Sequence, residues 1–286
     1  LIDADGNEKA STIADLRPII SAKMPVEDPV LWNGRKNPYL YTVRCEIFDS
    51  TTEEVTDNID IRTGLREYHI DSHKGFFLNG EHIKLQGVSR HQDRENMGNA
   101  ITEKQHAEDI KIILDVGANS VRLAHYQQNS YFYDLCDESG LLVWAEVPVI
   151  SRFSPKRNEN AEQQLVELIK QNYNHPSIFC WGIENEITIA GSASKKLITF
   201  LKHMHKVARH LDPTRYTTCA QLTTCPVNSP LNHITDIIGY NHYYGWYMGS
   251  CDEINNWLDE WHRENPEGKL CLSEYGAEGI TKYHSD

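Results

Sequence analysis

The sequence predicts an α/β fold, a (β/α)8 TIM barrel preceded by a partial immunoglobulin-like β-sandwich domain. Residues 1–64 read as short strands separated by turns, whereas strand-like and helix-like segments alternate at regular spacing from residue 76 onward. No G-x-G-x-x-G motif and no phosphate-binding G-x-x-x-x-G-K motif occurs, which removes the usual reason to prefer an open, doubly wound sheet. We therefore expect a sandwich domain over 1–64 and a TIM-barrel domain over 65–286.

The first domain is predicted from one long strand and the turns before it. The segment 39–48 is rich in β-branched and aromatic residues, and its later part alternates apolar and polar side chains. Asn33-Gly34 and Asn37-Pro38 mark turns, and no stretch within 1–64 has a helical pattern. A sandwich of this kind usually has about 100 residues, so we expect only part of one here.

The barrel domain is predicted to open with a hairpin over 76–85 that turns at Asn79-Gly80. Amphipathic helices are expected over 102–116, 161–173 and 194–210, and the first begins with a capping-box pattern from Thr102 to Gln105. Gly117 and Gly140 stand where helices should end. Barrel strands are expected over 84–88, 120–124, 141–145, 177–181, 217–221, 236–240 and 270–273.

Only seven barrel strands are predicted before Asp286, so the eighth βα unit is expected to be missing. A seven-stranded arc leaves two strand edges unpaired and apolar surface exposed. Because such edges favour association, we expect a homo-oligomer.

The composition excludes several classes of partner. The chain has 286 residues and a formal net charge of −13, which disfavours binding to nucleic acid and to anionic membranes. No run of about 18 apolar residues is present to span a membrane. The seven cysteines form no C-x-x-C pair, and no N-glycosylation sequon occurs, so the expected location is cytoplasmic.

Polar side chains gather at the predicted strand ends, where the reactive residues of a TIM barrel lie. Two glutamates, Glu186 and Glu274, follow the fourth strand and end the seventh. The other strand ends contribute carboxylates, imidazoles, amides and a phenol: His91, Asp93, His125, Glu146, Asn185, Asn241 and Tyr243.

Two carboxylates that face each other across a pocket are typical of glycosidic bond cleavage. One protonates the leaving oxygen and the other attacks the anomeric carbon, from about 5–5.5 Å away in the retaining mechanism. The acid must keep its proton near neutral pH, which partial burial, the second carboxylate and Trp181 as an apolar wall would favour. Glu184 competes with Glu186, because residues i and i+2 of a regular strand share a face.

Over nearly its whole length the chain resembles glycoside hydrolase family 2, the family of β-galactosidases, β-glucuronidases and β-mannosidases. Leu31-Trp32, Pro38–Tyr41 and Thr63–Arg66 resemble the family's immunoglobulin-like domain and its exit into the barrel. The segments that resemble the barrel domain follow in the family's order: 76–91, 117–126, 132–141, 174–178, Asn185-Glu186 and 273–276.

The resemblance implies a role for each candidate residue. Glu186 would be the acid/base and Glu274 the nucleophile, which favours Glu186 over Glu184. Tyr243 would hydrogen-bond the nucleophile as a third catalytic residue. Substrate hydroxyls are expected to contact six polar side chains of the same rim: His91, Asp93, His125, Asn185, Asn241 and Tyr247.

No metal and no other cofactor is expected. Magnesium-dependent β-galactosidases of the family carry a Glu-x-His just after the third barrel strand. This chain has Ile150-Ser151-Arg152 there, so neither ligand is present.

The predicted activity is that of a retaining glycosidase acting on terminal β-D-galactosides. The segments 87–93 and 122–127 resemble those of bacterial β-galactosidases, whereas 241–247 resembles a segment that β-glucuronidases share with some of them. One alternative is a β-glucuronidase, whose carboxylate-reading Asn-x-Lys would follow the eighth strand. The others are an inactive piece of a larger family 2 enzyme and a partner-binding scaffold.

Overall fold

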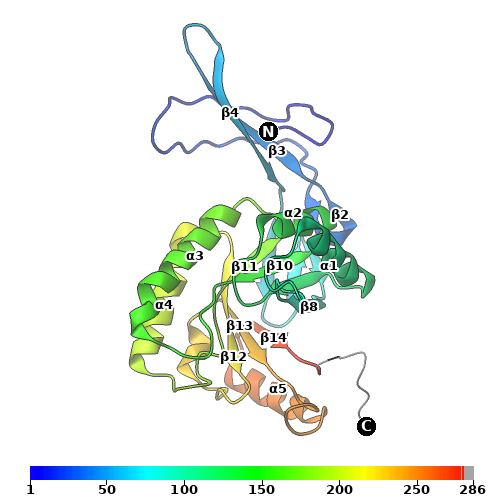
Figure 1. Ribbon diagram of the computed structural model, residues 1–286, viewed down its shortest axis with the longest axis vertical. Coiled ribbons are helices and arrows are strands. Elements are labelled where there is room, and N and C mark those ends of the chain that lie inside the picture. Colours follow the sequence, from blue (N-terminus) through cyan, green and yellow to red (C-terminus); the bar gives the residue numbers. More distant parts are fainter. Residues whose placement is uncertain (278, 280–286) are drawn as a thin grey trace.

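The computed structural model describes residues 1–277 and residue 279, and its centre is a seven-stranded parallel sheet (Figure 1). Sequence neighbours are spatial neighbours throughout this sheet, as in a (β/α)8 barrel, so the predicted barrel fold is confirmed. Within the described residues, the first and the last strand each have one neighbour. The strands are β8 (Gly87–Arg90), β9 (Ser120–Leu123), β10 (Leu142–Glu146), β11 (Ile178–Asn185), β12 (Tyr216–Leu222), β13 (Ile237–Asn241) and β14 (Leu270–Glu274).

Five α-helices are described beside this sheet, and Leu165, Leu197 and Met204 are among the fully buried side chains of the layer between helices and strands. The predicted capping box is present, since the Thr102 amide donates to the Gln105 side chain over 2.9 Å. None of the described helices is long and apolar enough to cross a membrane. They are α1 (Glu103–Asp115), α2 (Ser130–Ser139), α3 (Asn158–Asn172), α4 (Lys195–Leu211) and α5 (Glu253–Glu264), with short 3-10 turns at Gly34–Lys36, Pro155–Arg157 and Pro230–His233.

Two barrel strands differ from their predicted ranges for identifiable reasons. β8 begins at Gly87 because the Asn119 side chain binds the backbone of Lys84 and Gln86, which are therefore not paired with a strand. β11 continues to Asn185, well past the predicted end at Trp181, because its polar end is buried at the barrel mouth.

A small antiparallel sheet covers the amino-terminal end of the barrel. It consists of β5 (Tyr68–Asp71), β6 (Gly75–Leu78) and β7 (Glu81–Ile83), and the predicted turn at Asn79-Gly80 joins β6 to β7. Phe76 and Leu78 are buried against Leu142 and Trp144 of the barrel interior. These contacts join the small sheet to the amino-terminal part of the barrel interior.

The amino-terminal residues form part of a sandwich. β3 (Tyr41–Phe48) and β4 (Val55–Thr63) make an antiparallel hairpin that projects from the barrel, and β1 (Trp32–Asn33) pairs with β2 (Asn37–Pro38) near its base (Figure 1). Its anchors are the Trp32 indole, which donates to the Asp137 carbonyl over 2.9 Å, and the Thr63 hydroxyl, which donates to the Asn174 carbonyl over 3.0 Å. We propose that the domain boundary lies between residues 64 and 65.

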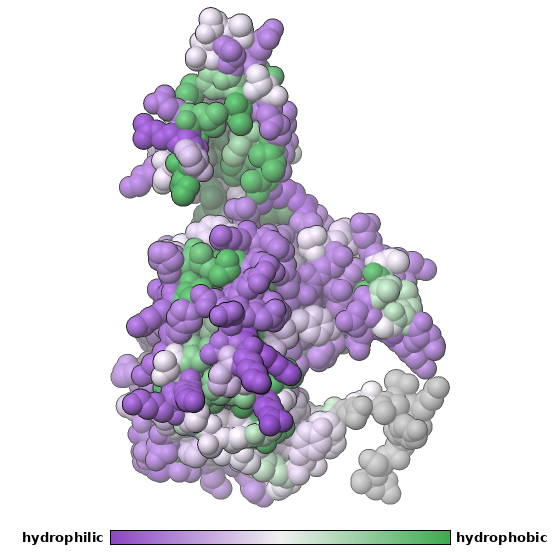
Figure 2. Space-filling view, turned by 60° about the vertical axis from the view of Figure 1, so that its left-hand side comes forward, coloured by the Kyte–Doolittle hydropathy of each residue, from purple (hydrophilic) through white to green (hydrophobic). Residues whose placement is uncertain are grey.

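Apolar side chains cover part of this projecting hairpin (Figure 2). Val55 and Ile59 are 51% and 58% exposed, which is high for β-branched residues of a sandwich strand. The described hairpin therefore carries the apolar surface of a sandwich without the second layer that would bury it.

Of the two glycines expected to end helices, Gly117 and Gly140, we predict that Gly140 tolerates substitution by alanine less well. Its φ is +72°, and an added Cβ would lie 2.2 Å from the Gly34 carbonyl oxygen. Gly140→Ala should lower the free energy of unfolding by about 3 kcal/mol or more, from backbone strain plus overpacking. Gly117→Ala is the matched control, because Gly117 has φ +82° with open space around it, and should cost about 1 kcal/mol. Equal losses in denaturant titrations would contradict this packing.

Candidate active site

A cavity of about 490 Å³ extends from Gly87 and Ser120, at the amino ends of two barrel strands, to polar residues at the carboxyl ends. It lies along β8, β9 and β14, and four of the predicted site residues line it: His91, His125, Tyr243 and Glu274. Glu186 is not among the lining residues, but hydrogen bonds through Asn185 and Asn241 join it to those that are.

Arg122 of β9 is the centre of these contacts and is only 5% exposed. Its Nε donates to Glu146 Oε2 over 2.9 Å, its Nη1 donates to Glu274 Oε1 over 2.7 Å, and its Nη2 donates to Asn185 Oδ1 over 2.7 Å. The guanidinium also lies 5.0 Å from the Trp144 ring centre. One cation therefore fixes side chains from β10, β11 and β14 in a single arrangement.

Glu146 binds both Arg122 and His125. Glu146 is buried, and its Oε1 lies 2.5 Å from His125 Nδ1. Burial alone would raise the pKa of Glu146, but Arg122 and His125 outweigh it, so the pKa is lowered and the group is an anion. This anion holds the His125 ring so that its Nε2 lies 3.9 Å from Glu274.

Glu274 ends β14 and its two carboxyl oxygens have different hydrogen-bond partners. Arg122 binds Oε1, and the Tyr243 hydroxyl donates to Oε2. Burial, and then the hydrogen bond to Glu274, raises the pKa of Tyr243, so its proton stays on the phenol and is available to the carboxylate.

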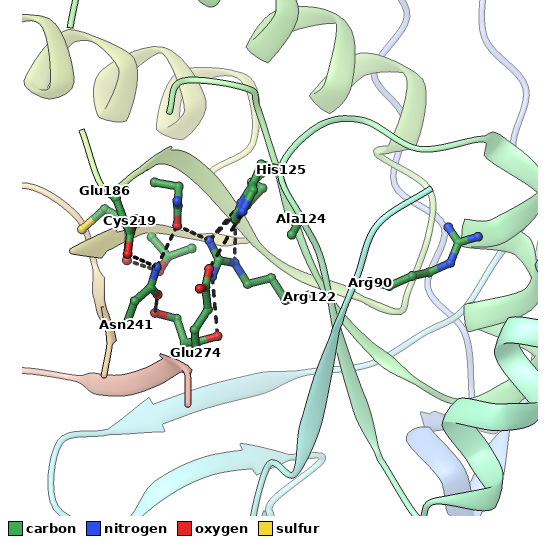
Figure 3. A network of polar contacts seen from close by, with 12 residues as sticks. Arg90, Arg122, Ala124, His125, Glu186, Cys219, Asn241 and Glu274 are labelled. Carbon is green, nitrogen blue, oxygen red and sulfur yellow. Dashed lines mark hydrogen bonds and ion pairs between the residues drawn. The ribbon is translucent and has the colours of Figure 1, made fainter. Parts of the chain in front are cut away.

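Glu186 lies across the mouth from Glu274 in a different environment (Figure 3). Its Oε1 accepts a hydrogen bond of 3.0 Å from Asn241, whose orientation is set because the Ser273 hydroxyl donates to Asn241 Oδ1 over 2.8 Å. Burial raises the pKa of Glu186, the Asn241 hydrogen bond opposes this, and the charge of Glu274 adds to it. Of the two carboxyl groups, Glu186 is thus the one suited to hold a proton.

The remaining predicted residues lie at the edge of this arrangement. The His91 ring centre is 5.2 Å from that of His125, at the cavity wall. Tyr247 is 70% exposed and stacks on Trp246 at 3.9 Å, with its ring 5.1 Å from Tyr243. Asp93 is exposed and does not line the cavity, although its charge acts on His91.

Two expectations about β11 are wrong. Glu184 does not share a face with Glu186, because an irregularity between Gly182 and Asn185 adds a residue to β11 relative to β12. Trp181 forms no wall of the site, since it packs in the layer between strands and helices and its indole donates to Asp212.

The site prediction omitted Arg122 and gave no role to Glu146, although it noted Glu146 at a strand end, and the structure places both at the centre of the site. A signal for both was present, since an arginine within an otherwise apolar barrel strand and a glutamate at a strand end must find partners when buried.

One group of metal-ligating side chains occurs within the described ranges, and it lies away from the mouth. Asp134, Asp137 and His175 are close together, but each already has a partner: Arg62 for Asp134 at 2.9 Å, and His175 for Asp137 at 2.6 Å. This cluster ties β4 to the barrel, and we assign no metal to it.

Comparison with known proteins identifies the family. A parallel barrel with charged and amide side chains at its carboxyl ends belongs to the (β/α)8-barrel class of enzymes. Residues 70–284 match the TIM barrel domain of glycosyl hydrolases family 2, and residues 2–66 match a further domain model of glycosyl hydrolases family 2. The chain therefore belongs to glycoside hydrolase family 2.

Three relatives show the range of named activities. A β-glucuronidase of Bacteroides fragilis is 40% identical over 91% of this chain, and the chain spans 37% of its length. The FMN-binding β-glucuronidase of Faecalibacterium prausnitzii L2-6 matches with a TM-score of 0.93 at 45% identity, over 99% of this chain and 44% of that one. A putative β-galactosidase from Bacteroides fragilis matches with a TM-score of 0.91 at 37% identity, over 100% of this chain and 42% of that one.

Glu146→Gln should destabilise the protein strongly, because it leaves the buried Arg122 charge with less compensation. We expect the free energy of unfolding to fall by about 3 kcal/mol. Asp115→Asn is the control, since it breaks an ion pair with Lys111 whose side chains are 61% and 76% exposed, and it should cost about 0.5 kcal/mol or less. Denaturant titrations that gave the two variants similar losses would rule out the central role of Arg122.

Proposed function

We propose that this chain carries the active site of a retaining β-glycosidase, with Glu186 as acid/base and Glu274 as nucleophile. The observation that carries the proposal is the contrast between the two carboxyl groups. Glu274 is bound by a guanidinium and a phenol, whereas Glu186 faces amides and has a raised pKa. A pair of this kind divides the two roles that the retaining mechanism needs.

In the first step, a Glu274 oxygen attacks the anomeric carbon as the glycosidic C–O bond breaks, and the Glu186 proton passes to the leaving oxygen. In the second step, Glu186 takes a proton from water, the water oxygen attacks the same carbon, and Glu274 leaves as a carboxylate. The Tyr243 hydroxyl and Arg122 stabilise the charge that returns to Glu274.

The amides and imidazoles of the mouth are proposed to bind the sugar. Asn185 Oδ1 accepts hydrogen bonds from both Arg122 and Asn241, so its Nδ2 is the atom that can donate to a substrate hydroxyl. We assign Asn241, His125 and His91 to further hydroxyls. Asp93 is retained as a candidate that would have to reach the sugar from the loop after β8.

A β-glucuronide is the substrate that we favour. The sequence alone predicted a β-galactoside. Of the three relatives above, however, the two with the higher identities are named β-glucuronidase. A β-galactoside is the second candidate, supported by the putative β-galactosidase of Bacteroides fragilis. Because the chain spans less than half of each relative, activity should be measured on the complete gene product as well as on this chain.

Glu186→Gln and Glu274→Gln test the assignment directly. Each should lower kcat on a phenyl β-glycoside by about 10²–10⁴-fold or more, because a proton donor or a nucleophile is lost. In the wild type, kcat/KM should fall as pH rises through the raised pKa of Glu186, since only the protonated form can donate. This basic limb should disappear in Glu186→Gln. Wild-type pH dependence in that variant would contradict the assignment.

The two substrates are distinguished by comparing kcat/KM for p-nitrophenyl β-D-glucuronide and p-nitrophenyl β-D-galactoside. We expect the glucuronide to be preferred by at least about tenfold. If only the complete gene product cleaves either, this chain is a piece that needs the rest for activity. The chain is a binding scaffold if the wild type cleaves neither substrate and if sugar binds with equal affinity after both glutamates are replaced.

Tyr247→Ala should raise KM severalfold and leave kcat nearly unchanged. The exposed Tyr247–Trp246 pair at the mouth can contact substrate, and neither side chain has a hydrogen bond to Glu186 or Glu274 in the described structure. Ile189→Ala, which shortens another exposed side chain near the mouth, is the control and should change neither constant. A large loss of kcat with unchanged KM in Tyr247→Ala would contradict this placement.

A further inference from the structure

Glu184 is a fully buried carboxyl group that the mechanism above does not use. It lies two residues before Glu186, yet it does not line the cavity and makes no ion pair with any Lys, Arg or His of the described chain. Burying a carboxyl without a cation is costly, so a residue kept in this state needs an explanation.

Its two oxygens have specific partners. Oε2 accepts the backbone N–H of Ile187 over 3.1 Å, and Oε1 accepts the Gln221 amide over 3.3 Å. The Ile187 side chain is only 2% exposed. Without Glu184, this N–H would lose its partner in a place that water does not readily reach.

The surroundings keep Glu184 protonated near neutral pH. Burial raises its pKa to about 8, and the charge of Glu146 adds to this, while the Ile187 N–H, Arg122 and Cys219 act in the opposite direction. A neutral carboxyl can remain in this apolar layer and still accept the Ile187 hydrogen bond.

The hydrogen bond lies at the turn that presents Glu186. Glu186 has φ +49°, a left-handed conformation that a non-glycine residue adopts only when its surroundings hold it. On one side, its own N–H donates to the Ala220 carbonyl over 2.7 Å. On the other side, the next N–H donates to Glu184. The turn is thus held on one side by β12 and on the other by the Glu184 side chain, together with the Ile189 N–H, which donates to the Glu186 carbonyl over 2.9 Å.

We propose that Glu184 is a positioning residue that holds the Glu186 turn and so aims the Glu186 carboxyl at the leaving oxygen of the substrate. The proposal rests on the function assigned to Glu186 above. The proposal also gives the β11 irregularity a role. Because of the extra residue, the Glu184 side chain is buried behind the turn, whereas the Glu186 side chain lies at the mouth.

The test is the dependence of kcat/KM on the leaving group. A misplaced acid harms substrates with poor leaving groups, which need protonation, and spares those with good ones. Phenyl and 2,4-dinitrophenyl glycosides of the sugar that the wild type cleaves are the two probes. Glu184→Leu removes the acceptor and should lower kcat/KM for the phenyl glycoside by about 10²-fold, but only a fewfold for the dinitrophenyl glycoside.

Two further variants separate positioning from general damage. Glu184→Gln keeps an oxygen for the Ile187 N–H and should retain activity on both probes within a fewfold. Cys136→Ala removes another fully buried side chain of the layer between strands and helices, at a position that is not a partner of Glu184, and should not change the ratio between the probes. If Glu184→Leu does not fold, Glu184→Asp carries the same test, because its shorter side chain withdraws the acceptor.

Each outcome decides the question. Equal losses on both probes in Glu184→Leu or Glu184→Asp, or a loss in Glu184→Gln as large as in Glu184→Leu, would overturn the proposal. Glu186→Gln serves as the reference, since it should show the selective loss in full. If Glu186→Gln itself shows no leaving-group dependence, the function assigned to Glu186 fails. If Glu186→Gln shows it and the Glu184 variants do not, only the positioning role fails.

Discussion

The buried guanidinium of Arg122 is the constraint on which the mouth of this barrel depends. A cation that is 5% exposed must be matched by anions and hydrogen-bond acceptors, and Glu146, Glu274 and Asn185 supply them from three different strands. Because a guanidinium is planar and its donors point in fixed directions, these three groups cannot shift independently. The arrangement is therefore built before any substrate arrives.

The same constraint separates the two glutamates chemically. Glu274 is bound directly by the cation, whereas two amide side chains, Asn185 and Asn241, lie between the cation and Glu186. Arg122 binds one carboxyl group directly, whereas burial raises the pKa of the other, Glu186, despite the opposing hydrogen bond from Asn241. The sheet of β5, β6 and β7 is joined to the other, amino-terminal part of the barrel interior.

Much of this was predictable because it follows from local patterns. The alternation of strands and helices, the Asn79-Gly80 turn and the Thr102 capping box each involve residues close in sequence, and all three occur as expected. The glutamates at strand ends were predictable because every strand of a parallel barrel ends at the same rim. The substrate could not be predicted in this way, because segment 241–247 resembles one that β-glucuronidases share with some β-galactosidases.

The sequence failed where side-chain direction depends on tertiary packing. The extra residue in β11 interrupts the alternation of side chains between the two faces of the strand, and the residue types from Gly182 to Asn185 do not predict this irregularity. The importance of Arg122 depends on partners from β10, β11 and β14, which are distant in sequence.

The central claim is that Glu274 forms a covalent bond to the sugar while Glu186 delivers the proton. A 2-deoxy-2-fluoro glycoside with an activated leaving group slows both steps but lets the first proceed, so the intermediate accumulates. Intact-mass and peptide mass spectrometry should then find one fluoroglycosyl group per chain, on the peptide that contains Glu274. A label on Glu186 or Glu184, or none on an enzyme that the inhibitor has inactivated, would contradict the account.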